Sequence, residues 1–302
     1  MAKESCLICT VVYPDPVSET NARILIESLR TFGGSMTTMP VLCLVPAMGK
    51  DVSPTFRDVC QTNAVRVTSF AMPVEAVRFP LAADVAGAAH AENKARDAYD
   101  LLVWLGANTI VFQEPRHFLI PDHAILGYCP VHHTNIGSLI DDVLDPFWSL
   151  IYQVCKVPEE RVFPMKTHVD GKTLRPYFNA SSLVSRPDRG LFASWRDIFF
   201  NTYQQQNFKK FYEQDERYAI FMHQAILSGI ILAMFELNEM AKLPPTYNYP
   251  LHLWQDDITV SRPRKLHDLV TARHEVFYRD PNWRNKMPEG DNFKDWLVQR
   301  TK

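Results

Sequence analysis

The sequence lacks an excess of charge of either sign, and it lacks a long apolar run. Its 32 Lys and Arg residues are balanced by 34 Asp and Glu residues, which gives a net charge of -2 and a pI of about 6.6. Without a basic excess there is no bulk attraction to nucleic acid, so no nucleic-acid partner is expected and any anion site must be local. The longest nearly apolar window, Ala225–Phe235, is far shorter than the roughly 20 residues that span a bilayer, so no transmembrane segment is expected.

The chain also lacks the features of an exported or disulfide-rich protein. Its amino-terminal apolar run is short, ends at Pro14 and has no small-residue cleavage site, so a soluble cytoplasmic protein is expected. One Cys-x-x-Cys spacing occurs, at Cys6 and Cys9, without a second pair at zinc-ribbon spacing. In a strand, residues three apart point to opposite faces and cannot share a metal ion. We therefore expect reduced core thiols at the six cysteines, Cys6, Cys9, Cys43, Cys60, Cys129 and Cys155.

The amino-terminal third alternates strands and helices. Ser5–Tyr13 is a continuous apolar run rich in β-branched residues, which is typical of a strand buried on both faces of a parallel sheet. Pro40–Val45 and Val65–Phe70 are the next strands, and Ser18 and Ser53 are the expected N-caps of the two intervening helices. This β-α-β-α-β order predicts a doubly wound α/β sheet, with the loops that follow its strands gathered at one edge.

The rest of the chain continues the α/β pattern, with no internal repeat and no low-complexity segment. Apolar runs predict further strands, and helical spacing or flanking polar residues predict further helices. The expected strands are Leu101–Leu105, Ala124–Val131, Tyr177–Val184 and Leu269–Thr271, and the expected helices are Asn93–Tyr99, Pro146–Cys155, Met222–Met240 and Phe293–Val298.

The most informative stretch is LLVWLGANTIVFQEP, Leu101–Pro115. An apolar run enters a short polar turn that contains Gly106 and Asn108, and a second apolar run, Ile110–Phe112, leaves it. This arrangement resembles the central segment of the GT-A glycosyltransferases related to glycogenin and to the bacterial lipooligosaccharide galactosyltransferases. In that family the turn reads Asp-x-Asp and holds a divalent cation on the diphosphate of a sugar nucleotide. In this chain both acidic positions of the turn are occupied by residues without a carboxylate.

Three further segments resemble the family and follow in its order. Pro176–Ser181 (PYFNAS) is similar to a Phe-Asn-Ala-Gly strand that lines the sugar pocket, and His223-Gln224 stands where many members have Asp-Gln at the start of a helix. Pro244–Asn248 is similar to a Leu-Pro-x-x-Tyr-Asn segment. The resemblance implies a GT-A-like doubly wound mixed sheet flanked by helices over residues 1–260, with residues 261–302 as a carboxy-terminal extension packed on the same domain.

The resemblance also implies a function and a set of site residues. It implies a glycosyltransferase that moves a sugar from a nucleotide-diphosphate donor, a UDP-sugar above all, to an unidentified acceptor, with Mn²⁺, Mg²⁺ or no metal as cofactor. The implied nucleotide-binding residues are Thr10, Tyr13, Lys94, Asn108, Arg262, Arg264 and Lys265, and the implied residues at the sugar and the reacting carbon are Asn179, His223 and Gln224. Packing for Tyr13, a strand-end role for Asn179 and a solvated loop at Arg262–Lys265 are the plainer alternatives.

The missing carboxylates leave three explanations open. A hard divalent ion neutralises the charge of a diphosphate and is itself held by carboxylate ligands, whereas Asn108 offers one neutral oxygen. The enzyme could use arginine and lysine instead of a metal. It could hold the metal on a displaced set, or it could be a catalytically inactive sugar-nucleotide-binding or scaffold protein. A sugar-1-phosphate nucleotidyltransferase is disfavoured because Pro14–Thr20 has no glycine for a phosphate loop. The displaced set would be drawn from Asn108, His132, His133, Asp141, Asp142, His267 and His274.

Overall fold

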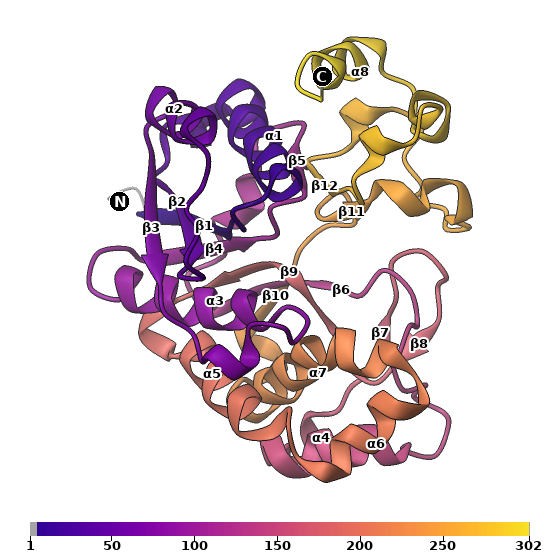
Figure 1. The fold of residues 1–302 in the computed structure, drawn as a ribbon. Coiled ribbons are helices and arrows are strands. Elements are labelled where there is room, and N and C mark those ends of the chain that lie inside the picture. The colour runs from indigo at the N-terminus through magenta and orange to yellow at the C-terminus, as the bar shows by residue number, and fades with distance from the viewer. Residues whose placement is uncertain (1–4, 302) are drawn as a thin grey trace.

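The computed structural model describes residues 5–301 and is built around a seven-stranded mixed sheet (Figure 1). The strand order is β10-β6-β9-β4-β1-β2-β3. Strand β9 is antiparallel to β4 and β6, and the other pairings of this sheet are parallel. The predicted α/β fold with a doubly wound mixed sheet is confirmed. The strands are β1 (Cys6–Val11), β2 (Val41–Pro46), β3 (Val65–Phe70), β4 (Leu101–Leu105), β6 (Leu126–Pro130), β9 (Phe178–Ser185) and β10 (Met240–Lys242).

Helices cover both faces of this sheet (Figure 1). Side chains of α1 and α2 share one core with Cys6 and Ile8 of β1, while those of α3, α5 and α7 share the other core with Leu7 and Cys9. Cys6 and Cys9 therefore point to opposite faces, as predicted, and all six cysteines are buried thiols. The helices are α1 (Pro16–Phe32), α2 (Pro54–Thr62), α3 (Ala82–Ala95), α4 (Pro146–Cys155), α5 (Leu191–Thr202), α6 (Gln206–Gln214), α7 (Glu216–Met234) and α8 (Asp291–Val298).

Capping side chains explain where the first two helices begin. Ser53 caps α2 as predicted, because its hydroxyl accepts a hydrogen bond from the Phe56 N–H at 3.1 Å. The cap of α1 is Asp15 rather than Ser18, since the Asp15 carboxylate accepts from two N–H groups of the first turn, each at 3.0 Å. The Ser18 hydroxyl instead accepts the N–H of Tyr13 at 2.8 Å. The loop after β1 is thereby tied to the first turn of α1.

Two predicted helices have the wrong bounds. The helix expected at Asn93–Tyr99 is α3, which begins at Ala82 and ends at Ala95. Its alanine-rich sequence is buried over most of its length, so it lacks the polar face that gives a helical periodicity. The helix expected from Met222 is α7, which begins at Glu216 because Asp215 caps it. The pair at 223–224 consequently lies about two turns inside the helix rather than at its start.

A second, three-stranded sheet connects the central turn to the carboxy-terminal part of the chain. Its strands are β5 (Thr109–Val111), β11 (Tyr249–Pro250) and β12 (Thr271–Arg273), and β12 pairs antiparallel with β5, with Ala272 opposite Ile110. The expected strand at Leu269–Thr271 is thus displaced by two residues. A hairpin of β7 (Met165–Lys166) and β8 (Thr173–Leu174) forms a separate two-stranded sheet.

Residues beyond 260 pack on the amino-terminal part, as Figure 1 shows for α8 near α1. The ring of Phe32 lies 4.8 Å from that of Phe293 and 5.3 Å from that of Trp296, measured between centroids. The Tyr278 hydroxyl donates to Asn21 Oδ1 at 2.9 Å. The division at residue 260 stays a prediction, and its outermost residues, 1–4 and 302, lie outside the described ones.

Among the described residues, α7 is the one helix long and apolar enough to cross a membrane. Inside the protein, however, 61% of its apolar window is buried, and α7 packs against β9, α4, α5 and α6. Its hydrophobicity is accounted for by its place in the core.

Candidate functional site

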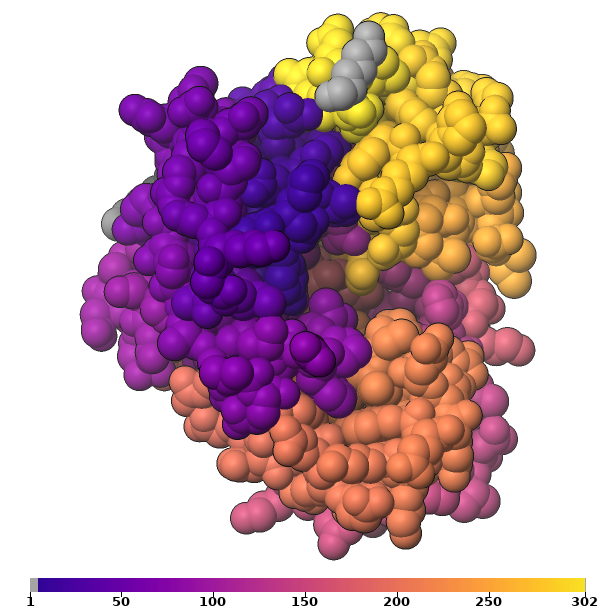
Figure 2. Space-filling model, in the orientation of Figure 1, coloured from indigo at the N-terminus to yellow at the C-terminus, as the bar shows by residue number. Residues whose placement is uncertain are grey.

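A cleft opens at the carboxyl ends of β1 and β4, where open α/β sheets bind their ligands. Its volume is about 350 Å³. Figure 2 shows the molecular face hollowed where the indigo, orange and yellow parts of the chain meet. Polar side chains from distant parts of the sequence line the cleft, and they are Tyr13, Asp15, Ser18, Asn21, Asp84, Asn108, Ser181, His223, Gln224, Arg273 and Glu275.

The turn that lacks the acidic residues forms one wall of this cleft. It is anchored at both ends, because the Gly106 N–H donates to the Ser181 carbonyl at 2.8 Å and the Thr109 N–H donates to the Gly106 carbonyl at 3.0 Å. A Cβ atom on Gly106 would lie 3.1 Å from Asn108 Oδ1 and 3.2 Å from Ser181 Cβ. The turn therefore has the expected place in the fold, and its side chains leave little room between them.

Two residues that sequence reasoning did not select, Arg273 and Glu275, reach this turn from the end of β12. Glu275 Oε1 lies 2.9 Å from Arg273 Nε and accepts a hydrogen bond from Asn108 Nδ2 at 3.4 Å. The Arg273 guanidinium also donates to the Ser181 hydroxyl at 3.4 Å. Alternation along a strand places the two side chains together, but the short β12 and its long-range pairing with β5 give no local sequence signal.

Arg273 retains an unused hydrogen-bond donor. Its Nε atom is buried and makes no hydrogen bond, although Glu275 Oε1 is at ion-pair distance, so the N–H is not aligned with that oxygen. Buried donors without an acceptor are uncommon in folded proteins. A ligand oxygen in the cleft can take this donor once the Glu275 carboxylate, 2.9 Å away, has moved.

Tyr13 and Asp84 form a second polar pair in the cleft. The Tyr13 hydroxyl donates to Asp84 Oδ2 at 3.2 Å. Burial raises the pKa of Asp84 to about 6, against the stabilising effect of the Tyr13 hydrogen bond and of Arg273 on the carboxylate. Asp84 was not among the predicted site residues, because the start of its helix, α3, was predicted eleven residues after its actual start.

The residues predicted at the sugar, Asn179, and at the reacting carbon, His223 and Gln224, are only partly in the cleft. His223 and Gln224 line it, whereas Asn179 is buried behind it. Burial lowers the pKa of His223 to about 3, so the imidazole is neutral at pH 7, with Nδ1 at 2.9 Å from the Ile220 carbonyl. Gln224 Oε1 accepts from the Ala180 N–H, and Asn179 Oδ1 accepts from the Ser181 N–H, both at 3.0 Å.

Five other predicted nucleotide-binding residues do not line the cleft. The Thr10 side chain is fully buried in β1, and Lys94 follows Asp84 by ten residues, or about 15 Å along α3. The guanidinium of Arg262 stacks on the ring of Trp254 at 4.3 Å and lines a separate surface hollow. The main-chain N–H groups of the two remaining residues, Arg264 and Lys265, donate to Asp268 Oδ2.

The displaced metal set is not assembled either. Over residues 5–301, no three His, Cys, Asp or Glu side chains are grouped so that they could hold a metal ion. His132 is buried with Nε2 at 2.9 Å from the Asn248 carbonyl, and His274 is fully buried with neither ring nitrogen in a hydrogen bond. The other members, His133, Asp141, Asp142 and His267, are exposed on the surface. With one neutral amide at the turn, these residues do not fit the cation of the family.

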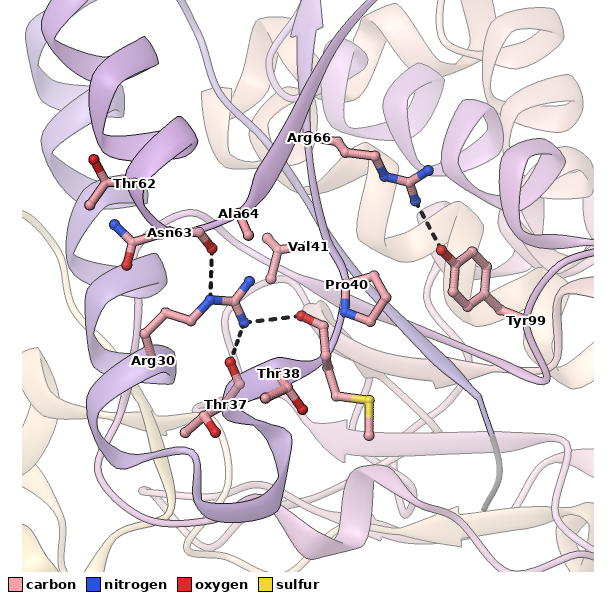
Figure 3. A pocket seen from close by; sticks show the side chains of 11 residues that line it. Arg30, Thr37, Thr38, Pro40, Val41, Thr62, Asn63, Ala64, Arg66 and Tyr99 are labelled. Atoms are coloured by element: carbon pink, nitrogen blue, oxygen red, sulfur yellow. Dashed lines mark hydrogen bonds between the residues drawn. The ribbon is translucent and has the colours of Figure 1, made fainter. Parts of the chain in front are cut away.

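A larger hollow, of about 730 Å³, lies at the opposite ends of β2 and β3 (Figure 3). Its two arginines already donate hydrogen bonds within the protein. Arg30 donates to the carbonyl oxygens of Asn63, Thr37 and Met39 at 2.7 to 3.0 Å, and Arg66 donates to the Tyr99 hydroxyl at 3.1 Å. This hollow lies at the amino-terminal strand ends, so we assign the ligand site to the cleft.

Comparison with known proteins identifies the fold. No family model and no curated protein matches the sequence. Among solved structures, the galactosyltransferase LgtC in complex with donor and acceptor sugar analogs matches with a TM-score of 0.55 and 13% identity, over 97% of this chain and 95% of that one. The glycosyltransferase GlyE of Streptococcus pneumoniae matches with a TM-score of 0.55 and 10% identity, over 99% of this chain and 60% of that one. The bifunctional glycosyltransferase WbbM matches with a TM-score of 0.53 and 11% identity, over 99% of this chain and 50% of that one. The chain has the GT-A fold of these glycosyltransferases.

Proposed function

We propose that this protein is a glycosyltransferase that takes its sugar from a nucleotide-diphosphate donor, with a UDP-sugar as the first candidate. In this proposal the donor diphosphate binds Arg273, and no metal ion is held by the Gly106–Asn108 turn. The observation that supports it best is the position of the Arg273 guanidinium, which lines the cleft beside that turn and is the basic side chain among the lining residues. A guanidinium can bind two phosphate oxygens at once, which suits a diphosphate.

The rest of the cleft fits the same ligand. The Asp84 carboxylate, presented with the Tyr13 hydroxyl near the end of β1, is suited to accept hydrogen bonds from the ribose hydroxyls. During transfer, the oxygen of an acceptor hydroxyl forms a bond to the anomeric carbon while the bond from that carbon to the diphosphate breaks, and the hydroxyl proton passes to the departing diphosphate or to solvent. Negative charge then develops on the departing diphosphate, and the fixed positive charge of Arg273 stabilises it.

The alternative is a catalytically inactive protein that binds a sugar nucleotide or acts as a scaffold on the same fold. It is supported by the hydrogen bonds that the side chains predicted at the reacting carbon already make within the protein. Gln224 Oε1 is used by the Ala180 N–H, and His223 Nδ1 lies against the Ile220 carbonyl. Neither side chain is a carboxylate, so neither can stabilise a cationic sugar as an acidic residue does.

A calorimetric titration separates these possibilities. A panel of UDP-sugars, with UDP and GDP as controls, is titrated into the protein in EDTA and again with manganese. Micromolar binding that persists in EDTA and is lost in Arg273→Ala is the expected result, with Arg273→Lys intermediate. Binding only with manganese, or none in either buffer, contradicts the proposed site. Release of UDP on addition of a saccharide acceptor then distinguishes the enzyme from the inactive binder.

A further inference from the structure

Glu275 occupies an unusual place for an acidic residue in a cleft that is proposed to receive a diphosphate. Its side chain is 46% exposed, and Oε1 lies against Arg273 and Asn108 together. The main chain fixes this arrangement, because the His274 N–H donates to the Asn108 carbonyl at 3.0 Å. A carboxylate is thus presented to the turn from another strand.

The charges of the cleft make the position of Glu275 consequential. Arg273 is the basic residue among the lining side chains, while Asp15, Asp84 and Glu275 are acidic. Of these acids, Glu275 is the one in an ion pair with Arg273. A diphosphate that approaches the guanidinium therefore meets a negative charge already beside it.

The ion pair is also a weak one. The Arg273 N–H nearest to Glu275 makes no hydrogen bond, and 28% of the Arg273 side chain is exposed. Partly exposed ion pairs of this kind contribute little to stability. A ligand with two negative charges and well-placed oxygens can replace such a partner.

We propose that Glu275 is an internal competitor for Arg273 that determines how tightly the cleft binds a nucleoside diphosphate. The inference rests on the proposed function, since it requires the diphosphate to bind Arg273. On binding, a phosphate oxygen takes the unused Nε–H, and the Glu275 carboxylate moves away from the guanidinium into solvent. Glu275 thereby reduces the affinity for anionic ligands and leaves that for an uncharged nucleoside unaffected.

The test compares Glu275→Gln with the wild type by titration of UDP, and of uridine as the uncharged probe, in EDTA at low salt. Separating two opposite charges about 4 Å apart costs about 1 kcal/mol even at the dielectric constant of water, which is a factor of about five in affinity for a ligand that must displace Glu275. We therefore expect UDP to bind at least about fivefold more tightly to Glu275→Gln, with the affinity for uridine unchanged. Asp295→Asn is the matched control, because Asp295 forms a similar exposed pair with Arg284 at 2.8 Å and does not line the cleft.

The outcomes separate this inference from the function on which it rests. Equal affinity of UDP for wild type and Glu275→Gln, with binding lost in Arg273→Ala, overturns the competitor and leaves the proposed site standing. Weaker binding by Glu275→Gln also overturns it, because Glu275 would then position Arg273 for the ligand. If UDP binds neither protein while both retain the same circular dichroism spectrum, the inference and the proposed function both fail.

Discussion

The main-chain N–H of His274 donates a hydrogen bond to the carbonyl oxygen of Asn108 over 3.0 Å, and this bond joins β12 to the turn between β4 and β5. Because Arg273 and Glu275 flank His274, their side chains are both delivered to the turn, while the His274 ring packs against Phe277 with its centroid 5.1 Å away. The charged groups nearest the turn therefore come from a segment about 165 residues further along the chain.

Restoring the acidic residues tests whether the turn keeps the geometry of the family. In Gly106→Asp combined with Asn108→Asp, we expect manganese to increase the affinity for UDP, as measured by calorimetry with and without EDTA. The new Cβ at 106 has contacts of 3.1 and 3.2 Å to its neighbours, so the free energy of unfolding should fall by about 1 kcal/mol. The single change Asn108→Asp is the control for charge alone. Absence of any gain with manganese would indicate that the turn is displaced.

The cluster at 262–265 should be dispensable for the cleft. Arg262 stacks on Trp254, and neither Arg262 nor Arg264 lines the cleft. We expect Arg262→Ala combined with Arg264→Ala to bind UDP with unchanged affinity and to lose less than about 1 kcal/mol of stability from the stacking contact. Calorimetry and urea unfolding measure the two quantities. Loss of UDP binding in this variant would restore the cluster to the site.

Asp84 should make stability depend on pH in a defined window. Burial raises its pKa from 3.8 to about 6, so the folded protein binds the proton more tightly than the unfolded chain does. The stabilising contribution of the protonated form is complete below about pH 4 and is lost as the pH rises to about 6. Between pH 4 and pH 7 the wild type should lose about 2 kcal/mol more unfolding free energy than Asp84→Asn does, as measured in urea. Parallel curves for the two proteins would contradict this assignment.

Gly87 should be intolerant of any side chain. It lies in α3, where a Cβ atom would stand 2.4 Å from Val11 Cγ2. A glycine-to-alanine change inside a helix gains about 1 kcal/mol from propensity, but forcing atoms this close costs about 1 to 3 kcal/mol or more. We expect Gly87→Ala to be destabilised in thermal unfolding, whereas Asn93→Ala, at an exposed position of the same helix, should be neutral or slightly stabilised. An equally stable Gly87→Ala would show that α3 can move away from β1.

The central part of the fold is predictable from the sequence because its signals are local. Leu101–Leu105 is apolar throughout and is buried on both faces as β4, and the polar turn after it has the position that the family resemblance gives it. Ser53 likewise predicts the start of α2, because capping depends on a few neighbouring residues. Such features need no knowledge of distant contacts.

The remainder of the site depends on long-range contacts that no local pattern encodes. Asp84 sits on a helix so buried that it shows no polar face, and Arg273 reaches the turn through a three-residue strand. The cluster at 262–265 has the composition of an anion site and follows the right segments, yet the aromatic ring of Trp254 holds Arg262 elsewhere. Charge and order along the chain therefore pointed to basic residues of the carboxy-terminal part, whereas the basic side chain that lines the cleft is that of Arg273.

The pairing of β5 with β12 has a consequence for how the protein is made. A chain that emerges from the ribosome amino-terminus first has β1 to β4 and its glycine-containing turn synthesised about 165 residues before Arg273. Until β12 adds to β5, the nascent cleft has acidic walls and no counter-charge, and it offers nothing to attract a phosphorylated metabolite. Under the proposed function, diphosphate binding therefore requires that β12 has been synthesised and has paired with β5.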